Sequence, residues 1–222
     1  MNMKTVRYIP LLQLFVSLLF FTGCNMRYNG SSELNHECAY TIDGEIASLE
    51  VSGGADVVVD ATIARNQVRV LSNTDDFSKL VVKTDGDRLE ISHKRNTGNK
   101  EYKVFVPAFD YKVLSLSGGS DFEWNGCNVD ILAATVSGGA DCEIKGKCNS
   151  LAVNVSGGAD ADMDELIAGE VVVVASGGAD VELHAVKTIS IVASGGADVY
   201  VGGTPQISEW NVSGAADVHI KK

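Results

Sequence analysis

A hexapeptide close to Val-Ser-Gly-Gly-Ala-Asp occurs seven times in this chain of 222 residues and constrains the fold more than any other feature. Successive aspartates of these copies are 65, 20, 19, 20, 18 and 19 residues apart. A nearly fixed short period is typical of solenoids, in which each repeat forms one structural unit that stacks on the next. The repeat aspartates are Asp56, Asp121, Asp141, Asp160, Asp180, Asp198 and Asp217.

Residues around each aspartate alternate between apolar and polar, and many are β-branched, which favours strands over helices. Because residues two apart in a strand share a face, the odd positions counted from each aspartate are expected in the core. Around Asp160 these positions include Val155, Ala161 and Met163, and Trp124 and Trp210 also fall on odd positions. The sequence therefore predicts an all-β protein, a parallel β-solenoid wound as a right-handed β-helix.

The long first interval between repeats does not fit one solenoid turn. It contains several short strand-like runs and a hairpin signal at Asp85-Gly86. We expect a single solenoid domain over residues 34–222, with a strand-rich capping insertion at about 61–113 and the regular repeats at about 114–222. A cap at the N-terminal end is needed because open sheet ends pair with other chains.

The run Asp85-Gly-Asp-Arg-Leu-Glu-Ile91, followed by serial Ser-Gly-Gly-Ala-Asp repeats, resembles the putative auto-transporter adhesin, head GIN domain, family of bacterial lipoproteins. The resemblance extends from about Leu34 to Lys221. It implies a β-solenoid on the cell envelope and an adhesive role, and it implies no catalytic residues. A fold shared with a family does not by itself establish a function.

The N-terminal residues predict export. Lys4 and Arg7 precede an apolar run from Leu11 to Phe21, an order typical of a secretory signal. The run is about half of the ~20 residues that cross a bilayer. Phe21-Thr-Gly-Cys24 resembles the lipobox of bacterial lipoproteins, which implies cleavage before Cys24 and lipidation of its thiol. We expect residues 1–23 to be the signal peptide, 24–33 a tether, and the protein to be anchored by lipid to a membrane of the cell envelope, in our prediction the outer membrane.

The chain without its signal peptide is acidic, with 16 basic and 29 acidic residues and a formal net charge of −13. An acidic surface repels phosphate backbones, so we exclude nucleic acid as a partner. The expected partners are the membrane, through the lipid anchor, and a glycan or protein ligand.

Carboxylates also stand two residues after four of the repeat aspartates, so four successive turns present carboxylate pairs on one face. Two interpretations stay open. In the first, the repeat only builds the corner: Gly-Gly permits a bend or close packing, and Ser and Asp hydrogen-bond backbone groups of the corner. In the second, the carboxylates form a cation or glycan site. Calcium, which takes six to eight oxygen ligands, is the metal such a stripe favours, and no other cofactor is expected. The stripe comprises Asp121, Glu123, Asp141, Glu143, Asp160, Asp162, Asp180 and Glu182.

Cys127 and Cys148 lie 21 residues apart, close to one turn, which predicts a disulfide between neighbouring turns. They stand six and seven residues after their aspartates, so they are one position out of line. Cys142 falls on a core position and is expected as a buried free thiol.

The carboxylate ladder is regular, whereas a catalytic site interrupts regularity at one place, and no Gly-x-Ser-x-Gly nucleophile motif occurs. We therefore predict a protein without enzymatic activity that presents a rigid repetitive surface for adhesion or ligand binding. The alternative is a β-helix enzyme that degrades or modifies polysaccharides, since paired carboxylates also suit glycoside hydrolysis.

Overall fold

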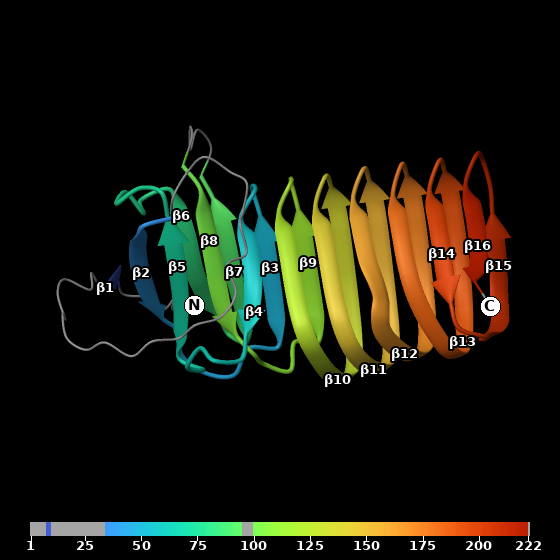
Figure 1. Cartoon of the computed structure of the whole chain (residues 1–222), viewed down its shortest axis with the longest axis horizontal. Coiled ribbons are helices and arrows are strands. Elements are labelled where there is room, and N and C mark those ends of the chain that lie inside the picture. The colour runs from blue at the N-terminus through green and yellow to red at the C-terminus, as the bar shows by residue number, and fades with distance from the viewer. Residues whose placement is uncertain (1–7, 10–33, 95–99, 222) are drawn as a thin grey trace, which may run out of the picture.

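The computed structural model describes residues 8–9, 34–94 and 100–221, and their regular structure is entirely strand. The molecule is an elongated β-solenoid, which confirms the predicted fold class (Figure 1). The predicted signal peptide, Cys24 and the tether lie outside these residues except for β1 (Tyr8–Ile9), which pairs antiparallel with β2 (His36–Thr41). Within the described part of the chain, no helix is long and apolar enough to span a membrane.

Each regular turn, here called a rung, contributes one strand segment to each of two facing parallel sheets. The long strands bend from one sheet into the other, and the repeat aspartates of successive rungs pair in register from Asp121 to Asp217. The rungs are built from β9 (Val113–Ser117), β10 (Asp121–Gly138), β11 (Asp141–Gly157), β12 (Asp160–Gly177), β13 (Asp180–Gly195), β14 (Asp198–Gly202), β15 (Gln206–Val212) and β16 (Asp217–Lys221).

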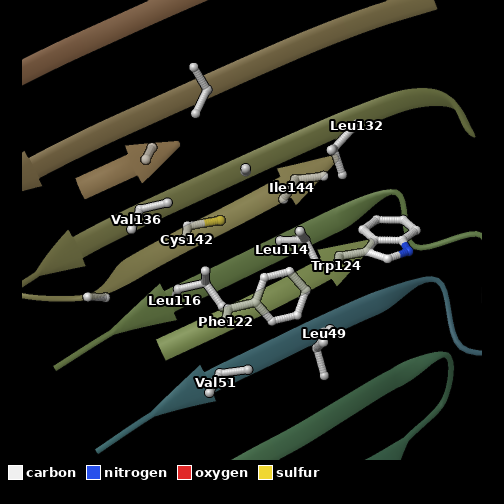
Figure 2. Close-up of a cluster of buried hydrophobic side chains, with 14 of the residues drawn as sticks. Leu49, Val51, Leu114, Leu116, Phe122, Trp124, Leu132, Val136, Cys142 and Ile144 are labelled. Carbon is white, nitrogen blue, oxygen red and sulfur yellow. The ribbon is translucent and has the colours of Figure 1, made fainter. Parts of the chain in front are cut away.

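The core lies between the two sheets and is filled by the odd positions of the repeat. Val155 and Met163 are fully buried and Ala161 is 2% exposed, so the predicted strand parity is confirmed. Figure 2 shows Leu114, Phe122 and Trp124 pointing into this space. Burial of such columns in every rung supplies the main stabilising free energy of the fold, at ~25 cal/mol per Å² of apolar surface.

The insertion after the first repeat extends the solenoid before closing it. β3 (Ser48–Ser52) and β4 (Asp56–Asp60) pair in parallel with β7 (Arg88–His93) and β8 (Tyr102–Pro107), which form one further rung. Beyond them, β5 (Gln67–Ser72) pairs antiparallel with β8, and β6 (Leu80–Asp85) pairs antiparallel with β7. β2 pairs antiparallel with β5 and closes this end. The hairpin expected at Asp85-Gly86 joins β6 to β7, with a φ of 64° at Gly86.

Between β8 and β9 the chain returns past β4 to start the regular rungs, and aromatic residues fix this crossing. Tyr111 is fully buried, and its hydroxyl donates a hydrogen bond to the carbonyl of Pro107 at 2.8 Å. Its ring meets Phe109 and Trp124 edge to face, at centroid distances of 5.8 and 5.6 Å. Trp124 is 3% exposed, in agreement with its predicted core position.

The C-terminal end of the solenoid is open. Trp210 in β15 is 49% exposed, so the prediction that it is packed away from solvent is wrong. Its position in the strand does face the core side, because it pairs with the buried Ile191 of β13. Within the described residues β15 pairs only with β13, so no strand lies on its outer side and the ring is left exposed.

Candidate functional site

The predicted stripe residues lie together on the outer surface of one sheet. The repeat aspartates form one column, and Glu123, Glu143, Asp162 and Glu182 pair in register to form a second. Neighbouring strands of a sheet are about 4.8 Å apart, so each column brings like charges close together. We call this surface, formed by the outward residues of β4, β14, β16 and the first halves of β10 to β13, the acidic face.

The two columns differ in their internal contacts. Glu143 lies 2.9 Å from Lys145, which also contacts Glu165 at 2.7 Å, and Glu182 lies 3.4 Å from Lys221. By contrast, no hydrogen bond or ion pair from the described residues reaches the carboxylates of the aspartate column. These carboxylates are Asp121, Asp141, Asp160, Asp180, Asp198 and Asp217.

The corner that precedes each aspartate is built by glycine, not by the aspartate. Gly177 has a φ of 82°, and a Cβ at this position would lie 2.6 Å from the carbonyl oxygen of Gly157 in the preceding rung. A Cβ on Gly178 would have only an ordinary contact of 3.8 Å, and Ala215 takes this second position in the last repeat. The corner interpretation is thus correct for the first glycine, whereas the aspartate carboxylates make no bond to the corner.

A shallow hollow of about 450 Å³ lies on the acidic face where the capping strands meet the regular rungs. Asp56 and Lys103, paired across β4 and β8, line it beside Asp121, Asp141 and Asp160. Burial, and to a lesser extent the charge of Asp121, raises the pKa of Asp56 to about 6. Asp56 and Lys103 lie outside the predicted stripe, since only the topology of the insertion brings Lys103 to the repeat.

The carboxylates of the acidic face do not converge on a common calcium site. Within residues 8–9, 34–94 and 100–221, no three His, Cys, Asp or Glu side chains converge closely enough to hold a metal ion. Side chains that point outward from a flat sheet run parallel instead of surrounding a point, so the oxygen ligands that calcium needs do not gather.

The predicted disulfide is not formed, because Cys127 and Cys148 are both free and buried. The register shifts after Asn125, so Cys127 lies opposite Gly146 while Cys148 lies opposite Val129. The two thiols are therefore displaced along their strands. Burial raises the pKa of Cys148 to about 11 and that of Cys127 to about 12. Cys142 is buried and free, as predicted.

The opposite sheet carries a different outer surface, which we call the neutral face. Three of its outward columns hold no charged side chain from β9 to β13. The first column is Val113, Ala133, Ala152, Val172 and Ser190. The second is Ser115, Thr135, Asn154, Val174 and Val192. The third is Ser117, Ser137, Ser156, Ser176 and Ser194.

A parallel solenoid with a flat carboxylate ladder on one sheet defines a class of protein, a repeat protein that presents an extended surface. Comparison with known families gives the same result in finer detail. The family described as putative auto-transporter adhesin, head GIN domain, matches residues 45–205, and the chain belongs to this family. The resemblance seen in the sequence is thereby confirmed.

Solved structures share the fold at low sequence identity. A crystal structure of a putative adhesin from Bacteroides fragilis superimposes with a TM-score of 0.61 at 16% identity, covering 84% of this chain and 96% of that one. A putative lipid binding protein from Parabacteroides distasonis gives a TM-score of 0.50 at 14% identity with the same coverage. A comparison with curated proteins found no match.

Proposed function

We propose that this protein is a lipid-anchored protein of the cell envelope that binds its ligand without catalysis, through the acidic face. The observation that carries the proposal is the aspartate column, a carboxylate in every rung with no hydrogen bond or ion pair inside the described molecule. Such a column is destabilising by itself, because like charges on neighbouring strands repel. Its presence is accounted for by a partner outside the chain.

Charge defines the chemical class of that partner. A surface lined by carboxylates, in a chain whose net charge is −13 once residues 1–23 are removed, attracts cationic groups and repels phosphate and sulfate. We assign the ligand to proteins or glycans that present amines or guanidinium groups at intervals along an extended chain. Membership in an adhesin family and a fold shared with putative adhesins support a role in attachment.

Binding is tested with the mature chain carrying Cys24→Ser, immobilised and exposed to basic peptides, amine-bearing glycans and neutral glycans. We expect the cationic ligands to be retained, and we expect their retention to fall steeply as the salt concentration rises from roughly 50 to 500 mM, because salt screens interactions between charges. Apolar binding would not weaken with salt in this way. A variant with Asp141, Asp160 and Asp180 replaced by Asn should lose most of this retention. Thr135→Ala and Asn154→Ala on the neutral face are the matched control and should leave it unchanged.

Two other results would contradict the proposal. Equal retention by the triple Asn variant would show that the acidic face is not the binding surface. Release of shortened products from a glycan would identify the protein as the polysaccharide-degrading enzyme instead.

The anchor is tested separately, in cells that express the full chain. We expect Cys24→Ser to move the protein from the membrane fraction to the supernatant, because acyl chains on the N-terminal cysteine supply the stable attachment. An unchanged membrane fraction together with an unchanged mass of the N-terminal peptide would refute lipidation at Cys24.

A further inference from the structure

The two ends of the solenoid are finished differently. At the N-terminal end, antiparallel strands from the insertion pair with the last parallel strands, whereas β15 and β16 are the last strands of their sheets at the other end (Figure 1). Ile207 and Trp210 are 44% and 49% exposed there, and Val212, Val218 and Ile220 are half-buried. The C-terminal end thus leaves both apolar core residues and a strand edge uncovered.

Backbone groups of β16 point out of this end. The N–H of Asp217 donates to Ala197 in the preceding segment at 3.0 Å, so it points back into the solenoid. Since successive residues of a strand direct their backbone groups to opposite edges, Val218 and Ile220 direct their N–H and C=O groups to the open edge. A strand presented in this way pairs with a further strand.

The sequence of β16 fits a second copy of itself. When β16 pairs antiparallel with its own copy about a two-fold axis through His219, Asp217 faces Lys221 of the other chain and Lys221 faces Asp217. Val218 of each copy then faces Ile220 of the other copy on the core side. Directly opposite residues on antiparallel strands point to the same face, so charged side chains meet outside and apolar ones inside.

This arrangement also satisfies the backbone. In an antiparallel pair, alternate opposed residues exchange both of their N–H···O=C bonds. With the axis at His219 these are Val218 with Ile220 and Ile220 with Val218, the two residues whose backbone groups face the open edge. Shifting the axis to Val218 or Ile220 leaves neither Asp217 nor Lys221 opposite a residue of the other charge.

We propose that the open C-terminal end is an interface between two copies of this chain, formed by antiparallel pairing of β16 with β16 of the second copy. Lys221 is 62% exposed in its contact with Glu182, so it remains accessible to the second copy. Trp210 lies on the core side of β15 at the same end, so we expect the second copy to cover its ring as well. Isologous two-fold contact is the commonest mode of self-association.

Because the contact involves only the last strands of each copy, we expect it to bury less than the ~800 Å² per partner of a standard stable complex. We therefore expect a weak dimer, measured by sedimentation velocity of the mature Cys24→Ser chain at roughly 10 to 500 µM. A chain that stays monomeric over this range would overturn the proposal.

Charge reversal provides the decisive experiment. Asp217→Lys places Lys opposite Lys, and Lys221→Asp places Asp opposite Asp, so each single variant should associate about tenfold or more weakly than the parent. A mixture of the two variants restores both opposite-charge pairs and should form a mixed dimer. The double variant with the two charges exchanged should form its own dimer.

Folding controls distinguish loss of the interface from loss of the fold. Thermal unfolding of each variant shows that it is folded, and recovery in the mixture excludes misfolding as the cause of weak association. Singles that dimerise like the parent, or a mixture that stays monomeric, would overturn the pairing of β16. Trp210→Ser should weaken the dimer without changing the charge pattern, whereas Ile131→Ser, an exposed apolar position away from the end, is its matched control.

Discussion

The regular rungs and the junction with the cap use the same hexapeptide under different conditions. From β10 onward only the first glycine of each pair has a positive φ, as at Gly157 and Gly177. At the junction with the cap both glycines do, with φ values of 75° and 82° at Gly53 and Gly54 and of 82° and 95° at Gly118 and Gly119. The repeat sequence therefore does not by itself determine the corner, because the neighbouring strand also contributes.

One substitution in the repeat compensates for this difference. Ser120 replaces the alanine found at the same position in the other repeats and is fully buried. Its hydroxyl accepts a hydrogen bond from the N–H of Gly54 at 3.2 Å and donates one to the carbonyl of Ser117 at 3.0 Å. In the regular corners the equivalent N–H bonds directly to backbone, as Gly178 does to Gly157 at 2.7 Å. The junction thus replaces a backbone acceptor with a side-chain hydroxyl.

The largest effect is expected in the regular rungs. Gly177→Ala places an L side chain at a positive φ and forces its Cβ toward the carbonyl of Gly157, which should lower the free energy of unfolding by about 3 kcal/mol or more. Gly178→Ala is the matched control and should change it by less than about 0.5 kcal/mol, since Ala215 already occupies that position. Chemical denaturation measures both. A similar loss in the two variants would refute the stacked-glycine corner.

A smaller effect is expected at the junction corner. Ser120→Ala leaves the N–H of Gly54 without its acceptor and should cost about 1 to 3 kcal/mol, the penalty for an unsatisfied buried donor. Ser137→Ala removes a hydroxyl with a longer contact of 3.4 Å to Leu116 and should cost less. If alanine at position 120 were neutral, the corner would obtain its hydrogen bond in another way.

The smallest effect is a pH dependence at the hollow beside the cap. The pKa of Asp56 is about 6 in the folded protein against an ordinary value of 3.8, so the folded state binds the proton more tightly. The contribution of Asp56 to stability is therefore complete below about pH 4 and is lost as the pH rises to about 6. With partial exposure to solvent, the loss should be about 1 kcal/mol.

Asp56→Asn should remove this dependence, so that the variant matches the parent near pH 4 and exceeds it in melting temperature at about pH 7.5. Asp141→Asn, on a carboxylate of the regular rungs, is the control. If the difference in melting temperature between the parent and Asp56→Asn is the same at about pH 7.5 as at about pH 4, burial does not perturb the pKa of this carboxyl.

The regular rungs were predictable and the junction was not, for a physical reason. Where each strand pairs with the next copy of itself, the parity of Ala161 and Met163 and the alignment of the stripe follow from period two and a fixed repeat length. The pairing of Asp56 with Lys103 depends on which strand of the insertion meets β4, which local patterning does not encode. The bulge after Asn125 likewise displaced Cys127, and the missing neighbour exposed Trp210.

In-register stacking makes the regular rungs interchangeable units. Removing residues 160–179 would join Ala159 to Asp180 and place β11 against β13, with both ends of the molecule unchanged. The acidic face would shorten by about 4.8 Å, the spacing of one strand. Duplication of a rung within the gene would lengthen it by the same step. The span of ligand that this surface contacts is thus set by the number of repeats, and can change through recombination without redesign of the fold.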